Sequence, residues 1–126
     1  MNVVDSCGWI EFFARGPNAG FFIPAVTATE MLVVPTLCMY EVYKCVLAQF
    51  SLEQSLEMIH LMRTGMVVPL DERIALDAAL ISRDLKLSLA DSIILASARR
   101  YNAVLWTQDA HFEHIEGVRY CQKVVS

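Results

Sequence analysis

Apolar residues occur along this chain in two alternating patterns. In the first, apolar and β-branched residues follow one another almost without a break over four or five positions. Such runs are typical of strands buried on both faces, as in a parallel sheet. The pattern predicts five strands, at residues 2–5, 31–34, 66–70, 103–107 and 118–121.

In the second pattern, apolar residues recur every three or four positions, which indicates helices with a buried face. The predicted helices lie at residues 6–15, 18–27, 36–50, 51–64, 71–85 and 88–101. Pro24 should kink or shorten the second of them. The expected N-caps are Ser6, Thr36, Ser51, Asp71 and Ser88. Alternation of strands and helices predicts one α/β domain over residues 1–126, with three α/β/α layers around a parallel sheet.

The composition excludes two classes of protein. Hydrophobic residues make up 56% of the chain and charged residues 19%, which excludes intrinsic disorder. No apolar stretch approaches the roughly 20 residues of a spanning helix, and the first residues lack the basic start of a signal peptide. We therefore expect no membrane segment. The apolar fraction exceeds the needs of so small a core, which predicts surfaces covered by partners, including a second copy of the chain.

The net charge and the positions of cysteine and histidine limit the possible classes of protein further. The net charge is −4, so the chain as a whole lacks the basic profile of a nucleic-acid-binding protein. The four cysteines form no C-x-x-C pair and have no zinc-ligand spacing with the three histidines, which favours reduced thiols in the cytoplasm. His111 and His114 are expected to lie in a solvated turn rather than in a site. Arg99 and Arg100 end a helix, where they complement its dipole or contact RNA.

Two carboxylates follow predicted strands. Asp5 ends the first strand, and Asp109 lies two residues beyond the fourth. Ligand sites of open α/β sheets lie at the carboxyl ends of strands, where the strand order reverses. If the second and third strands lie on one side of the first strand and the fourth strand lies on the opposite side, both acids flank that point. As alternatives, Asp5 caps a helix and Asp109 stabilises a turn.

Two further carboxylates occur in helices. Glu41 lies in a helix that is apolar nearly all round, which predicts a buried helix and a costly buried charge. An ion pair with Lys44 is the alternative, although it explains Glu41 less well. Asp91 follows Ser88 by three residues, as in a capping box, and it could also face a shared pocket.

Clustered carboxylates repel one another and stay partly protonated without a cation. Clusters rich in oxygen suit Mg²⁺ or Mn²⁺, and such ions assist attack of water on a phosphodiester. Without these four acids, ten acidic residues would balance ten basic ones, so the rest of the surface would not repel RNA.

Four short segments contain these acids. They are Val3-Val4-Asp5-Ser6, Tyr40-Glu41-Val42, the A-D-S-I-I-L-A stretch at residues 90–96, and W-T-x-D-x-x-F at residues 106–112. With these segments in this order, over residues 3–112, the chain resembles the PIN-domain family. Within that family it is similar to the VapC-type toxins of prokaryotic toxin–antitoxin pairs.

The resemblance implies a PIN fold with five parallel strands in the order 3-2-1-4-5. It implies an Mg²⁺- or Mn²⁺-dependent endoribonuclease that hydrolyses RNA with a water activated at the metal. Its partners would be a cognate antitoxin and a second copy of the chain, in a homodimer or a larger complex. The implied metal ligands are Asp5, Glu41, Asp91 and Asp109. Thr107 would orient a water or a carboxylate.

At two positions the resemblance leaves the role of a residue open. Ser6 matches a small polar residue of the family, and capping a helix explains it equally well. The family commonly has a second acid where this chain has His111, so no metal role is assigned there.

Other classes of function have weaker support. The chain has no glycine-rich phosphate loop. A receiver-type signalling domain shares the layered fold, but it would need adjacent acids after the first strand, where this chain has Asp5-Ser6. A non-catalytic dimeric binding module is the main alternative, and the pairs Phe12-Phe13 and Phe21-Phe22 would serve its interfaces.

Overall fold

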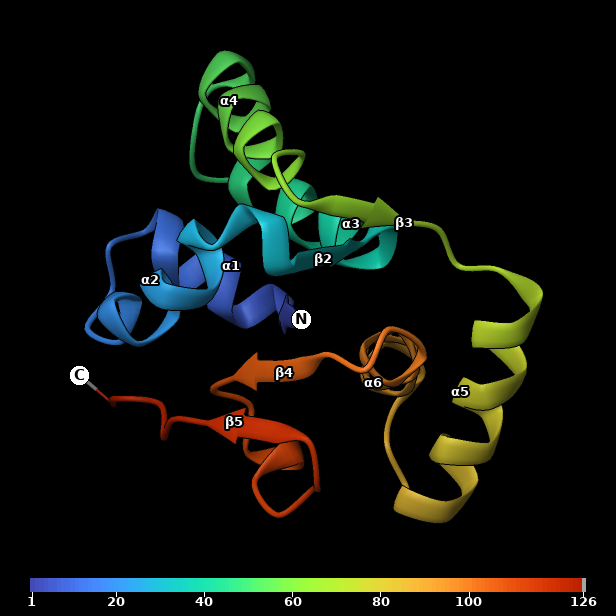
Figure 1. Ribbon diagram of the computed structural model, residues 1–126. Coiled ribbons are helices and arrows are strands. Elements are labelled where there is room, and N and C mark those ends of the chain that lie inside the picture. The colour runs from blue at the N-terminus through green and yellow to red at the C-terminus, as the bar shows by residue number, and fades with distance from the viewer. Residues whose placement is uncertain (126) are drawn as a thin grey trace.

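Five parallel strands form one sheet at the centre of the computed structural model, which describes residues 1–125 (Figure 1). The strands are β1 (Asn2–Val4), β2 (Leu32–Pro35), β3 (Met66–Val68), β4 (Val104–Thr107) and β5 (Val118–Tyr120). Their order is β3-β2-β1-β4-β5, and every neighbouring pair is parallel. The predicted sheet and strand order are confirmed. The apolar runs of β1, β2 and β4 are almost wholly buried, as the continuous pattern indicated.

Helices cover both faces of this sheet. They are α1 (Ser6–Phe13), α2 (Ala19–Thr27), α3 (Thr36–Leu47), α4 (Leu52–Met62), α5 (Glu72–Leu85) and α6 (Leu89–Arg100), with the short 3₁₀ helices η1 (Thr29–Met31) and η2 (Ala110–Phe112). Figure 1 shows α1 and α2 on one side of the strands and α5 and α6, packed together, on the other. The predicted three-layer α/β/α class is thus confirmed.

Three predicted N-caps are confirmed, because their side chains accept a backbone hydrogen bond three residues on: Ser51, Asp71 and Ser88. Two others are wrong. Ser6 and Thr36 are the first helical residues, and the N-caps are Asp5 and Pro35. At α1 the carboxylate of Asp5 accepts the backbone N–H of Ser6, so the Ser6 hydroxyl is not used as a cap.

Several element boundaries differ from the sequence-based expectation. Helix α3 ends at Leu47 rather than near Phe50, because a turn precedes the Ser51 cap. Strand β3 ends at Val68, since its pairing partner β2 also ends there, at Pro35. Pro24 removes one backbone donor but does not stop α2, which continues to Thr27.

The position of β1 between β2 and β4 creates the point where the strand order reverses. Val4 pairs with Trp106 in the sheet, so the next residues, Asp5 and Thr107, lie side by side at the ends of adjacent strands. The backbone N–H of Asp5 donates to the Trp106 carbonyl oxygen at 2.9 Å. The register of the sheet therefore fixes where the first acid lies.

Part of the apolar surplus lies on the surface. Helix α4 exposes Leu52, Leu56 and Leu61, and α5 exposes Leu76 and Leu80. Within residues 1–125, none of the helices has the length and apolar character that crossing a membrane requires.

Candidate active site

Asp5 is the most buried of the predicted acids, with 4% of its surface exposed. One carboxylate oxygen, Oδ1, accepts the Ser6 N–H at 2.7 Å, and Oδ2 accepts the Thr107 hydroxyl at 2.8 Å. Burial raises the pKa of Asp5 to about 6; the two hydrogen bonds oppose this effect and the negative charge of Asp91 adds to it. Asp5 is thus both the helix cap that one interpretation expected and a carboxylate at the end of β1.

Thr107 joins the first acid to the last. Its fully buried hydroxyl donates to Asp5 Oδ2 and accepts the backbone N–H of Asp109 at 2.9 Å. One hydroxyl therefore sets the position of the Asp5 carboxylate and of the turn that carries Asp109. The orienting role that the resemblance implied for Thr107 stays a prediction.

Glu41 comes to this cluster from α3. The Ser6 hydroxyl donates to Glu41 Oε1 at 2.7 Å, and the backbone of Ser6 holds Asp5.

The expectation that α3 is buried all round is wrong, because Tyr40 and Lys44 are exposed and Glu41 is only half-buried. The buried face consists of Cys38, Val42 and Val46. Lys44 directs its Nζ over the Tyr40 ring, 5.9 Å from the centroid, so the alternative ion pair with Glu41 is not what the structure shows.

Asp91 lies in the first turn of α6. The Ser88 hydroxyl accepts its backbone N–H at 3.3 Å, which is one half of the predicted capping box. The Asp91 carboxylate instead lies 3.3 Å from His111 Nδ1. Its pKa is raised, first by burial and then by the charge of Asp109, while the hydrogen bond from His111 opposes the rise.

Asp109 and His111 form the turn after β4. Asp109 caps η2, and its Oδ1 accepts the backbone N–H of His111 at 2.9 Å. His111 Nδ1 lies 3.3 Å from Asp109 Oδ1 and 3.3 Å from Asp91 Oδ2. His111 lies in an exposed turn, as expected, but its ring lies between two of the predicted site acids. The D-x-H spacing could have indicated this turn, since an aspartate side chain commonly accepts the backbone N–H of the residue two positions on.

The structure thus brings the predicted site residues to one edge of the sheet in two groups. Asp5 and Glu41 are linked through Ser6. Asp91, Asp109 and His111 each offer a ligand atom, and these atoms lie within 4.8 Å of one another. The raised pKa values of Asp5 and Asp91 fit a divalent cation, because a cation stabilises the charged form and oxygen is the ligand that Mg²⁺ and Mn²⁺ prefer.

Cys7 is a neighbour of this cluster that the sequence interpretation missed. Its Sγ lies 3.5 Å from Asp5 Oδ2 and 3.4 Å from Thr107 Oγ1. Burial, followed by the charge of Asp5, raises the pKa of Cys7 to about 12. Cys7 therefore remains a protonated thiol, which argues against a cysteine nucleophile. All four cysteines are free.

A hollow of about 460 Å³ opens beside Asp109. Its lining consists of Cys7, Gln108, Asp109, Ala110, Tyr120, Gln122 and Lys123. Lys123 places a positive charge in its wall.

Arg99 and Arg100, by contrast, lie at the end of α6, roughly 12 Å along the helix from Asp91, and do not flank the acids.

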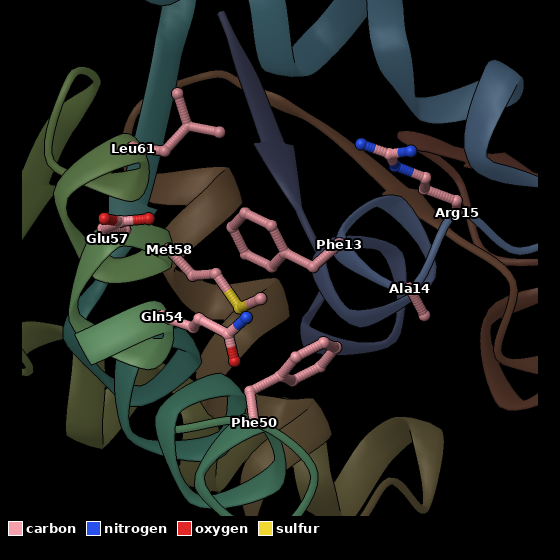
Figure 2. Close-up of a pocket in the computed structure, with 8 residues that line it drawn as sticks. All are labelled: Phe13, Ala14, Arg15, Phe50, Gln54, Glu57, Met58 and Leu61. Atoms are coloured by element: carbon pink, nitrogen blue, oxygen red, sulfur yellow. The ribbon is translucent and has the colours of Figure 1, made fainter. Parts of the chain in front are cut away.

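A larger groove of about 540 Å³ lies between the end of α1 and α4 (Figure 2). Figure 2 shows Phe13 and Arg15 on one side, facing Met58 and Leu61 across the groove. The remaining lining residues are Ala14, Phe50, Gln54 and Glu57. Helix α1 begins beside Asp5 and ends at this groove, so one helix of eight residues separates the groove from the acids.

The fold and this arrangement agree with a family comparison. The PIN domain family model matches residues 3–118, and the chain belongs to that family. A comparison with curated proteins finds none that matches the chain by sequence.

Solved structures of the same fold include proteins of toxin–antitoxin systems. A toxin–antitoxin complex from Klebsiella pneumoniae contains a chain that is 21% identical, with a TM-score of 0.82, covering 94% of this chain and 96% of that one. VapBC-1 from Haemophilus influenzae is 21% identical, with a TM-score of 0.71 and 96% coverage of both chains. Mycobacterium tuberculosis VapC20, described as a sarcin–ricin loop cleaving toxin, is 14% identical, with a TM-score of 0.72, covering 92% of this chain and 95% of that one.

Proposed function

We propose that this protein is a divalent-metal-dependent endoribonuclease and the toxin of a toxin–antitoxin pair. The observation that carries the proposal is the convergence of Asp5, Glu41, Asp91 and Asp109 at one edge of the sheet, with Thr107 bonded to two of them. These five residues are the proposed active site. The similarity to solved toxins, one of which is described as a sarcin–ricin loop cleaving toxin, supports the substrate class.

In this proposal the four acids hold Mg²⁺ or Mn²⁺. When bound, such an ion neutralises phosphate charge and lowers the pKa of a water for in-line attack on the phosphodiester. The chain's own groups set the geometry. Thr107 keeps the Asp5 carboxylate oriented through a donated hydrogen bond, and Ser6 does the same for Glu41.

The hollow beside Asp109 would receive the nucleotide next to the scissile phosphate. It is open to solvent at the edge of the acid cluster, and Lys123 offers it a positive charge. A single lysine within a chain of net charge −4 would give local attraction for a phosphate without a basic surface.

An antitoxin segment would occupy the groove between α1 and α4. Apolar side chains line the groove, and Arg15 and Glu57 at its walls offer charge for orienting a peptide. From there an extended or helical segment would need to span only the length of α1, roughly 12 Å, to place an Arg or Lys among the acids. Similar chains occur in solved toxin–antitoxin complexes, which supports this partner.

A cleavage assay tests the proposed function. Purified protein should cut RNA internally in Mg²⁺ or Mn²⁺ and should stop when EDTA removes the ion. Asp109→Asn should abolish cleavage, whereas Asp77→Asn should not, because Asp77 lies on α5 beside Arg99 and Arg100, at the opposite end of α6 from Asp91. Absence of cleavage by folded, metal-loaded protein on a broad set of RNAs would favour the alternative, a non-catalytic binding module.

A further inference from the structure

His111 holds a position between two carboxylates that belong to distant parts of the chain. Asp91 comes from the first turn of α6 and Asp109 from the turn after β4, and His111 Nδ1 lies 3.3 Å from an oxygen of each. The turn itself is fixed. Phe112 is fully buried beneath it, and the backbone N–H of His111 is bound to Asp109.

Stability alone does not account for this placement. The His111 side chain is 73% exposed, and ion pairs at such exposure contribute little to folding. The spacing does match ligands of one ion. Atoms bound at about 2.1 Å lie roughly 3.0 to 3.4 Å apart when they are neighbours in octahedral or tetrahedral geometry.

We propose that His111 Nδ1 is a ligand of the divalent cation, which makes this a mixed nitrogen and oxygen centre selective for first-row transition ions, such as Mn²⁺, over Mg²⁺. The inference rests on the proposed function, because it adds a ligand to the same site. The neutral imidazole would carry its proton on Nε2 and donate the Nδ1 lone pair. Imidazole nitrogen favours transition ions, whereas Mg²⁺ prefers oxygen ligands and keeps several waters.

The chain offers a matched control in the same turn. His114 lies three residues further on, is 91% exposed, and has its Nε2 3.5 Å from Glu113 rather than from the cluster. His111→Ala and His114→Ala therefore each remove one exposed imidazole, and only the first removes one beside the acids. Thermal melts in EDTA should show both variants folded.

Calorimetric titration with Mn²⁺ alone and with Mg²⁺ alone gives the first readout. His111→Ala should weaken Mn²⁺ binding at least about tenfold and Mg²⁺ binding much less, while His114→Ala changes neither. An equal loss for both ions, or no loss for either, would overturn the inference.

Pulsed electron paramagnetic resonance of the Mn²⁺-loaded full chain gives the second readout. A directly coordinated imidazole produces ¹⁴N modulation, which should be present in the wild type and His114→Ala and absent in His111→Ala. If Mn²⁺ binds and RNA is cut without this modulation, the histidine ligand is wrong and the proposed function stands. If no ion binds, both are wrong.

Discussion

The hydroxyl of Ser6 donates a 2.7 Å hydrogen bond to Oε1 of Glu41 and so joins the first turn of α1 to the middle of α3. Because the Ser6 backbone also binds Asp5, this one residue places two acids relative to each other. The geometry of the proposed site thus depends on a small residue that carries no charge.

Removing the Ser6 hydroxyl should therefore impair cleavage more than folding. Ser6→Ala should lower the rate of RNA cleavage about tenfold or more and cost about 1 kcal/mol of unfolding free energy, the usual contribution of one hydrogen bond. Ser97→Ala is the control, since Ser97 is also buried and bonds only within α6. It should show a similar stability loss with full activity. Equal activity of the two variants would contradict a positioning role for Ser6.

The contact between Ser6 and Glu41 allows a variant that removes the charge of Glu41 and keeps its hydrogen bond. In Glu41→Gln the amide oxygen can still accept the Ser6 hydroxyl, so the fold should persist while cleavage is lost. Lys44→Met should change neither activity nor melting temperature, because Lys44 is exposed and lies over Tyr40. A large drop in melting temperature for both variants would instead identify a structural ion pair.

The raised pKa of Asp5 predicts how the stability of the metal-free protein depends on pH. Its folded-state pKa of about 6 exceeds its ordinary value of 3.8, so the folded state binds the proton more tightly. The free energy of unfolding should then fall as pH rises from about 4 to about 6 and stay level above that range. The shift of about two pKa units corresponds to at most about 3 kcal/mol.

Asp5→Asn should abolish this contribution. In EDTA at pH 7.5 the variant should exceed the wild type in unfolding free energy by about 1–3 kcal/mol, and at pH 4 the two should be equal. The amide can still accept the Ser6 N–H and can donate to the Thr107 hydroxyl, so both contacts of Asp5 are kept, the second with its direction reversed. Denaturant titrations across pH give the measurement. The control is Asp77→Asn, because Asp77 is an exposed acid whose partner is Arg73, one helical turn away. A variant less stable than the wild type at pH 7.5 would show that the Asp5 charge stabilises the apo fold.

Thr107 should tolerate loss of its methyl group but not of its hydroxyl. Thr107→Val leaves Asp5 Oδ2 and the Asp109 N–H without this partner, which should cost about 1–3 kcal/mol and most of the activity. The pKa of Asp5 should rise further, because the Thr107 bond lowers it, so the acidic limb of the pH–rate profile should move to higher pH. Thr107→Ser should keep both bonds and the wild-type profile. If Thr107→Val and Thr107→Ser show the same activity and the same pH–rate profile, the hydroxyl has no orienting role.

Helix α5 offers a surface for a homodimer. Leu76 and Leu80 are 62% and 52% exposed on its outer face. With the helices of two copies antiparallel, Glu72 of one copy would lie near Arg83 of the other. Light scattering at high micromolar concentration should report a dimer for the wild type and a monomer for Leu80→Asp. Leu52→Asp, on α4, should remain dimeric. A monomeric wild type, or a dimeric Leu80→Asp, would exclude this interface.

Much of this architecture is predictable from local patterns. Buried parallel strands leave continuous apolar runs, so the sheet was visible in the sequence, and Asp5 and Asp109 were found because they follow two such runs. For Glu41, the reason given from the sequence was partly wrong. Its helix is buried on one face only, and apolar composition alone does not tell whether Tyr40 and Leu47 face a core or solvent.

The missed residues depend on tertiary contacts. His111 meets Asp91 only because the start of α6 and the turn after β4 lie at one edge of the sheet, although 20 residues separate them. Cys7 reaches Thr107 across 100 residues for the same reason. Ser6 was expected to cap a helix, and only the structure shows that Asp5 caps it and frees the hydroxyl for Glu41.

The chemistry of the product ends tests the central claim most directly. A defined RNA that the protein cuts, and the same RNA with a 2′-deoxy sugar at the cut site, would be digested in Mn²⁺ and the ends identified by mass spectrometry. Attack by water assisted by a divalent ion predicts 5′-phosphate and 3′-hydroxyl ends, and cleavage that survives removal of the 2′-hydroxyl. Ends carrying a 2′,3′-cyclic phosphate, or loss of cleavage in the 2′-deoxy RNA, would contradict the account.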